Sequence, residues 1–199
     1  MNTEFSIGAW IYGLAIISNS EFVRLRTTKK IKAKKMLTYF ANHDDIGNYF
    51  VQQGAVIPIH NIHNYDYTIF YRNEKDSAIP NEWDIIKELG KFNLTIGDDN
   101  CFWVSQLNEL EEWNNNKFLG LDCLTKQVYI KMNLETVYRA VKINMAKGYY
   151  TVKIFGIERK NILLEELKKR KKYGFLLELK QVNHLEESDD PTKTDFLFF

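Results

Sequence analysis

The chain has 199 residues, with 27 Lys and Arg against 26 Asp and Glu, so its formal net charge is +1. Hydrophobic residues make up 45% and charged residues 27%, an ordinary globular composition that excludes an intrinsically disordered protein. The near-zero net charge excludes a strong overall attraction to nucleic acid or anionic membranes. A chain of this length buries roughly 70% of its unfolded surface, so we expect a single globular domain over residues 1–199.

The first strongly apolar segment is residues 7–17, which contain no charged side chain. The run is shorter than the roughly 20 residues that a membrane-spanning helix needs. Glu4 precedes it, in place of the basic segment of a signal peptide. Cys101 and Cys123 have no CxxC spacing, which is typical of free thiols in a reducing compartment. We therefore expect a strand buried on both faces at residues 7–17, and a cytoplasmic location.

The next segments predict a hairpin followed by two helices. Residues 21–27 alternate apolar and polar side chains, which favours a strand paired with the first apolar run. Apolar residues in the segment 29–41 recur every three or four positions, as on one face of a helix. A second, shorter helix is expected over residues 44–54, where Gly54 ends it.

The middle of the chain predicts further hairpins and helices. Pro58 has no N–H to donate, so its strand is expected at a sheet edge or beside a bulge. The expected elements are a hairpin of residues 55–62 and 65–72, a helix over 81–90, a hairpin of 92–96 and 101–105, and a helix carrying Leu107, Leu110 and Trp113.

The last third alternates strands and helices in the same irregular way. The expected elements are a hairpin of residues 118–121 and 128–132, a helix over 133–148, a strand at 149–157, a helix that ends before Gly174 and a strand at 175–182. The inward-facing positions of the helix before Gly174 are Ile162, Leu163, Leu164 and Leu167. This order predicts an α+β fold with a mixed or mainly antiparallel sheet, built from hairpins with interleaved helices. The Asn run at 114–116 leaves open a division into two subdomains, 1–113 and 117–199.

Residues 24–35 carry seven positive charges and no acid, the largest local charge asymmetry in the chain. One interpretation is a surface that contacts nucleic-acid phosphates. The other is a solvated strand edge and helix face. The residues expected to bind nucleic acid under the first interpretation are Arg24, Arg26, Lys29, Lys30 and Lys34.

Histidines and acidic pairs are the candidate groups for metal binding or catalysis. His60, His63 and Asp66 are close in sequence, but a spacing of three on a strand points the two rings to opposite faces. We expect no metal and no cofactor, and keep as an alternative a metal-assisted hydrolase site formed by these residues with His43. The acid pairs at 44–45 and 98–99 fit turns and helix caps better than catalysis. The sequence has no P-loop, GxGxxG, GxSxG or HExxH motif.

Segregated charge and aromatic residues with polar tips favour a binding protein over an enzyme. The leading hypothesis is a non-catalytic cytosolic module, most concretely an immunity or inhibitor protein that neutralises a toxin or an enzyme such as a nuclease. The alternative is a nucleic-acid-binding or nucleic-acid-processing protein that uses residues 24–35. The aromatic end Phe196–Phe199 follows an acidic segment. We expect this end either to dock into the core or to contribute, together with the acidic segment, to a partner interface. The expected partner contacts are Tyr65, Tyr67, Tyr71, Glu109, Glu111, Glu112 and Trp113.

Overall fold

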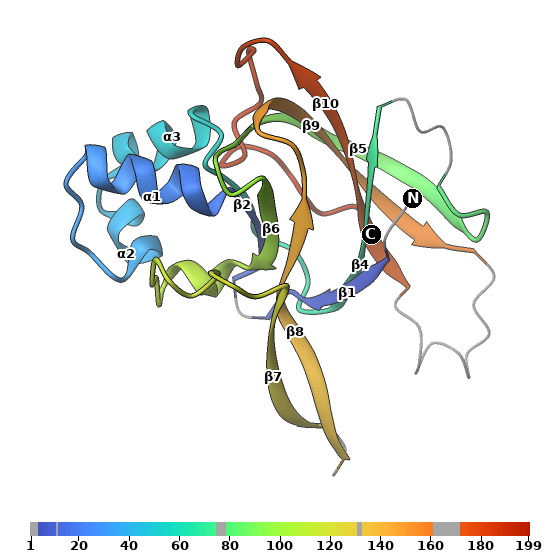
Figure 1. Cartoon of the computed structure of the whole chain (residues 1–199). Helices are drawn as coiled ribbons and strands as arrows, with labels where there is room; N and C mark the ends of the chain where they lie inside the picture. Colours follow the sequence, from blue (N-terminus) through green and yellow to red (C-terminus); the bar gives the residue numbers. More distant parts are fainter. Residues whose placement is uncertain (1–3, 11, 75–78, 131–132, 161–171) are drawn as a thin grey trace.

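A computed structural model of the chain describes residues 4–10, 12–74, 79–130, 133–160 and 172–199 (Figure 1). Two five-stranded sheets pack face to face, and three helices cover the outer face of one of them. The expected α+β class is confirmed, although the protein is predominantly β. Among the helices in the described part of the chain, none is long and apolar enough to cross a membrane.

The first sheet contains strands from both ends of the chain. Its strands lie in the order β1 (Phe5–Gly8), β4 (Asp66–Asn73), β10 (Tyr173–Val182), β9 (Gly148–Arg159) and β5 (Trp83–Ile96). Neighbouring strands are antiparallel except β4 and β10, which are parallel. The second sheet is antiparallel, in the order β3 (Val56–Ile59), β2 (Leu14–Ile17), β6 (Cys101–Gln106), β8 (Asn133–Asn144) and β7 (Cys123–Ile130).

The second sheet is the middle layer, with the first sheet on one side and the helices on the other (Figure 1). Alternate residues of its strands face the two layers, as the pleat requires. Ile16 and Phe102 pack against the first sheet, whereas Ile17 and Trp103 pack against the helices. The helical layer consists of α1 (Asn19–Thr28), α2 (Met36–Ala41), α3 (Asp44–Gln52) and the 3-10 helix η1 (Leu107–Leu110).

The expectation of one strand at residues 7–17 is wrong, because this run forms strands in two different sheets. β1 ends at Gly8 in the first sheet, and β2 begins at Leu14 in the second. Gly13 has a φ of +113°, and a β-carbon there would lie 2.2 Å from the carbonyl oxygen of Ile59. Glycine therefore lets the chain cross between the layers in a short, close turn.

Residues 21–27 form part of helix α1 instead of the expected strand. The Asp99 carboxylate accepts hydrogen bonds from the N–H and the hydroxyl of Ser20, at 3.2 and 2.6 Å. These bonds cap the N-terminus of the helix, where backbone N–H groups lack partners within the helix. Phe22 and Leu25, three positions apart, are fully buried beneath it.

The helix expected over residues 29–41 is confirmed only for α2, at residues 36–41, and residues 29–35 connect α1 to it. The Arg26 guanidinium donates to the Ala33 carbonyl oxygen at 2.6 Å and holds this connection against the end of α1. The expected helix that begins at Asp44 is confirmed as α3.

The helix expected over residues 81–90 is wrong, because residues 83–90 belong to the long strand β5. The pairing of β5 with β9 shifts register between Ile85 and Lys87, and again between Glu88 and Gly90. Ile86 and Leu89 are therefore extra residues at two bulges. Each bulge interrupts the two-residue alternation of a strand, so the apolar spacing imitates that of a helix.

The helix expected over residues 133–148 is also wrong, because residues 133–144 form β8. β8 pairs with β7, and β7 spans residues 123–130 rather than the expected 128–132. The strands expected at 149–157 and 175–182 are confirmed as β9 and β10. The inward-facing positions of the helix expected before Gly174, residues 162–167, lie outside the described residues.

Two expected hairpins do not form, because their strands lie in different sheets. β3 and β4 are separated in this way, and so are β5 and β6. The edge position predicted from Pro58 is confirmed, since β3 ends the second sheet. The helix expected around Leu107 is a single 3-10 turn. Each sheet takes strands from both sides of residues 114–116.

The C-terminal segment docks along the outer edge of β5. The Lys91 N–H donates to the Asp189 carboxylate at 2.8 Å, and the Asp189 N–H donates to the Lys91 carbonyl oxygen at 2.9 Å. Beyond this point Phe196 is fully buried in the core between the two sheets. The segment thereby covers backbone groups that an edge strand otherwise leaves open to another chain.

Candidate binding groove

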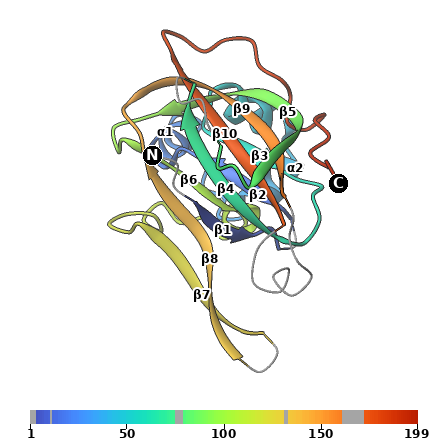
Figure 2. The same ribbon diagram turned by 90° about the vertical axis from the view of Figure 1, so that its right-hand side faces the viewer.

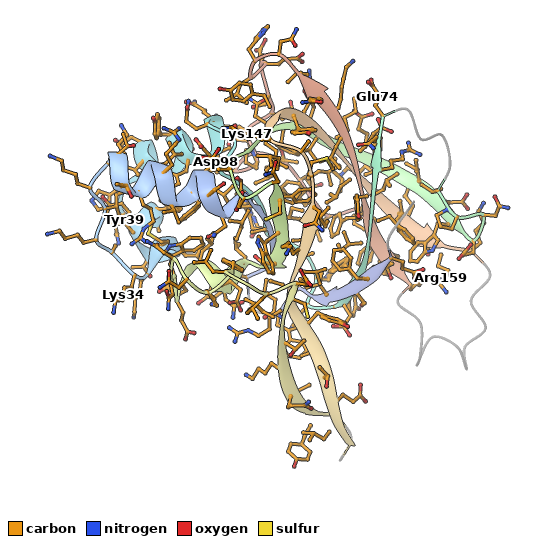
Figure 3. The ribbon with its side chains drawn as sticks, viewed as in Figure 1. Lys34, Tyr39, Glu74, Asp98, Lys147 and Arg159 are labelled. Atoms are coloured by element: carbon orange, nitrogen blue, oxygen red, sulfur yellow. The ribbon has the colours of Figure 1, made fainter. Side chains whose placement is uncertain are left out.

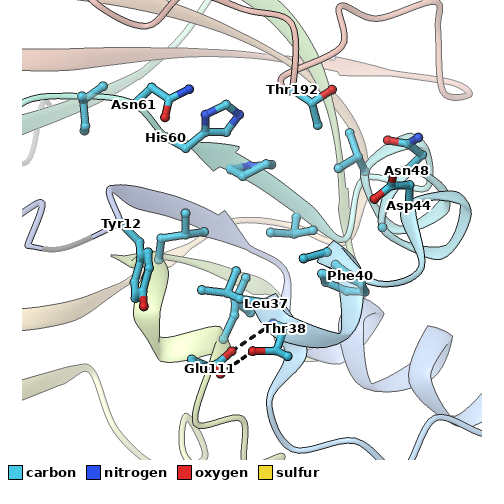
Figure 4. A pocket seen from close by; sticks show the side chains of 18 residues that line it. Tyr12, Leu37, Thr38, Phe40, Asp44, Asn48, His60, Asn61, Glu111 and Thr192 are labelled. Atoms are coloured by element: carbon cyan, nitrogen blue, oxygen red, sulfur yellow. Dashed lines mark hydrogen bonds between the residues drawn. The ribbon is translucent and has the colours of Figure 1, made fainter.

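A groove of about 760 Å³ opens between α2, α3, β3 and η1 (Figure 4). Its floor is apolar, and several of the side chains there, including Leu37, Phe40 and Val51, are only partly buried. Concave apolar surface of this size is the usual form of a binding site. The apolar lining residues are Leu37, Phe40, Ala41, Val51, Val56, Pro58, Ile62, Leu107 and Leu110.

The rim of the groove is polar, and its charge is negative. Asp44 at the start of α3 and Glu111 just after η1 line it, and the described lining contains no Lys or Arg. The remaining polar groups include Tyr12, His60 and Asn61. This arrangement favours a ligand whose apolar part is flanked by positive charge.

The Glu111 carboxylate is held in place by helix α2. It accepts a hydrogen bond from the Thr38 N–H at 3.0 Å and another from the Thr38 hydroxyl at 2.7 Å. The N–H lies in the first turn of α2, where a carboxylate is favoured by the unpaired backbone donors. The rim charge is therefore fixed in position before any ligand arrives.

The edge strand β3 forms one wall of the groove, and Pro58 lies within it. Because proline has no N–H, it weakens this edge as a template for another strand. The groove therefore suits recognition of side chains better than extension of the sheet.

The three histidines considered for a metal site have different neighbours. His60 lines the groove, His63 packs against the ring of Phe199, and His43 stacks on an aromatic ring of α2. Asp66 begins β4. In the described ranges, no group of three or more His, Cys, Asp or Glu side chains is placed to hold a metal ion. No protein-family model, curated protein or solved structure matches the chain.

Both cysteines are free thiols, and they differ in exposure. Cys101 is buried in β6, and Cys123 at the start of β7 is partly exposed. Burial, reinforced by the nearby Asp99 carboxylate, raises the pKa of Cys101 to about 11. Its thiol is therefore protonated at neutral pH and unsuited to act as a nucleophile.

Iodoacetamide at pH 8 is expected to alkylate Cys123 in the native protein and to leave Cys101 unmodified. The reagent needs an accessible thiolate, which burial and the raised pKa deny to Cys101. Mass spectrometry of peptides after timed labelling measures the two sites separately, and labelling in urea gives the fully reactive control. Equal labelling rates in the native state contradict this assignment.

The acid pair at 98–99 serves the structure. Asp99 caps α1, as described above, while the Asp98 carboxylate accepts a hydrogen bond from the Lys147 ammonium at 2.5 Å (Figure 3). This hydrogen bond, together with the positive charge, lowers the pKa of Asp98 and raises that of Lys147. The pair at 44–45 opens α3, and of the two only Asp44 lines the groove.

The basic segment 24–35 is partly engaged in contacts within the protein. Arg24 pairs with Glu21 at 2.5 Å, and Arg26 donates to Asn115 at 2.6 Å as well as to the α1–α2 connection. The Lys29 ammonium lies 4.2 Å from the centre of the Tyr49 ring. Of the five residues expected to contact phosphates, Lys30 and Lys34 point to solvent without such contacts (Figure 3 shows Lys34).

The residues expected to contact a protein partner do not form one surface. Glu109, Trp113 and Tyr67 are buried, so they lie inside the fold. Tyr71 is half-buried in the first sheet, whereas Tyr65 and Glu112 are exposed on separate segments. Of the seven, Glu111 alone lines the groove.

Sequence reasoning singled out Asp44, His60 and Glu111 individually but not as parts of one groove. These residues are far apart in the sequence, and they line the same groove only because the fold brings α2, α3, β3 and η1 together. The amphipathic pattern of residues 36–52 and the edge-strand proline were the signals available from sequence.

Proposed function

We propose that the protein is a non-catalytic protein-binding module whose groove receives an apolar segment of a partner, flanked by Lys or Arg. Its most concrete form is a cytosolic immunity or inhibitor protein that neutralises a toxin or another enzyme. The groove carries the proposal, because its apolar floor lies beneath a rim whose charged side chains, among the described lining residues, are Asp44 and Glu111. Apolar anchors supply most of the affinity at such sites, and charge pairing supplies specificity and a faster encounter.

The positions of the reactive side chains also support binding over catalysis. The Cys101 thiol is buried with a raised pKa. Of the acid pair at 98–99, Asp99 caps α1 and Asp98 pairs with Lys147. His60 lies at the groove, but its ring contacts Phe196, with centroids 6.2 Å apart. General acid–base chemistry needs groups within hydrogen-bond reach of a shared atom.

Reversing one rim charge tests the proposal. Tagged wild-type protein is expected to recover one partner at physiological salt from the cells that make it, and Asp44→Lys to bind the purified partner at least tenfold more weakly by calorimetry. A tenfold loss corresponds to about 1.4 kcal/mol. Asp45→Lys is the matched control, since Asp45 is also exposed in the first turn of α3 but lies outside the groove lining.

Three results would count against the proposal. They are the absence of any protein partner, equal losses in the two variants, and unchanged binding by Asp44→Lys. Recovery of DNA or RNA with steep salt dependence would instead favour the nucleic-acid function of residues 24–35, because phosphate contacts release counterions.

A further inference from the structure

Strands β7 and β8 continue past the other strands of the second sheet as a two-stranded arm, here defined as residues 125–130 and 133–138 (Figures 1 and 2). Only the upper part of β8, from Ala140 onward, is paired with β6. No other described strand pairs with the arm, and β7 ends the second sheet. A two-stranded ribbon by itself is marginally stable in water, so this arm lacks the support that other strands of the protein have.

One face of the arm carries large apolar side chains in solvent. Tyr129 is 78% exposed, Leu134 57% and Tyr138 42%. They share this face with Thr125, Gln127 and Thr136, because the register pairs Tyr129 with Leu134, Gln127 with Thr136, and Thr125 with Tyr138. The face therefore contains no charged residue. Uncharged surface rich in tyrosine is typical of the centre of a protein interface.

The outer edge of β7 is a second unpartnered feature. Its backbone donors and acceptors face away from β8 and are available to another strand. Natural edge strands are usually protected by proline, bulges or several charges. β7 has no proline, and Lys126 is its one charged residue. The bulge in the pair lies at Arg139 on β8, at the base of the arm.

We propose that β7 pairs antiparallel with β7 of a second copy of this chain, around a two-fold axis at Gln127. An axis perpendicular to the sheet keeps each side chain on its own face, so the residue at the axis faces itself. Placing Gln127 there sets Thr125 opposite Tyr129 of the second copy, and Lys126 opposite Val128. No two like charges then stand directly opposite one another.

Other registers of the same strand are worse. An axis at Lys126 places two lysines directly opposite each other, which is unfavourable. An axis at Val128 shortens the overlap, since β7 ends at residue 130. The Gln127 register gives the longest overlap without opposed like charges, and this self-complementarity favours a second copy as the occupant of the edge.

The proposed dimer also supplies the neighbouring strand that the arm lacks. Two arms form a four-stranded sheet in the order β8, β7, β7 and β8. Across one face run two symmetry-related rows, each with Leu134 and Tyr129 of one copy beside Thr125 and Tyr138 of the other. Between them lies a row of Thr136, Gln127 and their symmetry mates. Aromatic and β-branched neighbours of this kind stabilise cross-strand pairs.

Substituting a charged residue for Gln127 tests the proposal, and the mass of the protein in solution is the measurement. Sedimentation equilibrium of the wild-type chain at micromolar concentration is expected to give twice the 23.5 kDa monomer mass. Gln127→Lys and Gln127→Glu each oppose like charges, so each variant alone is expected to be monomeric. An equimolar mixture is expected to return to the dimer mass, because lysine then faces glutamate.

Thr136→Lys is the matched control, since Thr136 is exposed on the same face of the arm and neighbours Gln127. Its two copies lie three strand spacings, roughly 14 Å, apart in the proposed dimer, so this variant is expected to remain dimeric. A wild-type chain with the monomer mass overturns the proposal and leaves the edge to a different protein. A mixture of the two Gln127 variants that stays monomeric overturns it as well.

Cross-linking tests the register in a Cys123→Ser background. Gln127→Cys is expected to form an intermolecular disulfide under mild oxidation, because facing Cα atoms in a strand pair lie about 5 Å apart. Thr125→Cys is expected to stay uncross-linked, since its two copies are offset by about 13 Å along the strands. Equal cross-linking of the two variants overturns the Gln127 axis.

Discussion

Replacing Glu109 by alanine is expected to lower the free energy of unfolding by about 3 kcal/mol. Glu109 is fully buried in η1, and its carboxylate forms ion pairs with Lys117 and, at 2.5 Å, with Arg139. Removing the acid leaves two cations with no counterion at the edge of the helical core. Breaking a buried pair from one side is costly because the remaining charges keep their desolvation without their partner.

Urea denaturation of Glu109→Ala, Glu109→Gln and Glu112→Ala measures the effect. Glu109→Gln preserves size and isolates the charge, so most of the loss is expected to remain. Glu112 is the exposed acid three positions further on, and its substitution is expected to change stability by no more than about 0.5 kcal/mol. Similar losses for Glu109→Ala and Glu112→Ala would show that burial of the ion pairs is not the cause.

One ion pair of Glu109 also connects the base of the arm to the helical layer. Arg139 is the extra residue where the pairing of β7 and β8 shifts register, and bulges commonly redirect a side chain. Here the guanidinium reaches Glu109 and ties the base of the arm to η1. The sequence predicted Glu109 on a partner surface, because acids grouped with an aromatic residue suit an interface that uses charge complementarity and aromatic anchors. Glu109 is buried instead, because Lys117 and Arg139, the latter from a distant strand, neutralise its charge.

The elements that sequence reasoning predicted correctly are those with regular apolar patterns. At the centres of β9 and β10 the side chains either alternate between apolar and polar or are continuously apolar, and α3 has one apolar face. The edge position of Pro58 followed from its missing N–H alone. In each case the decisive information was local to the segment.

The elements that were wrong depend on distant partners or on bulges. β5 contains two extra residues relative to β9, so its apolar positions fall at helical spacings. Helix α1 is capped by Asp99, a contact between segments far apart in sequence. The groove depends on the same kind of information, since Asp44 and Glu111 meet only after α2, α3 and η1 pack together. The spacing of residues along the sequence does not reveal such contacts.

Replacing Phe196 by alanine is expected to lower the free energy of unfolding by about 4 kcal/mol. The ring is fully buried between the sheets, with centroids 5.8 Å from Phe92 of β5 and 6.2 Å from His60. The substitution removes apolar contact and leaves a cavity that the surrounding sheets can fill only in part. Chemical denaturation of the variant measures the loss, and Leu197→Ala, at a side chain that is 38% exposed, is the control.

The same variant separates the two roles considered for the C-terminal segment. If this segment mainly served a partner interface, Phe196→Ala would weaken partner binding and leave stability close to that of Leu197→Ala. If Phe196 is instead a structural anchor, Phe196→Ala loses much more stability than Leu197→Ala, and two neighbouring regions are affected as well. Asp189 would release the outer edge of β5, and Thr192 would leave the wall of the groove. Binding at the groove is therefore expected to weaken in Phe196→Ala only as far as the segment detaches, which limited proteolysis of residues 183–199 measures directly.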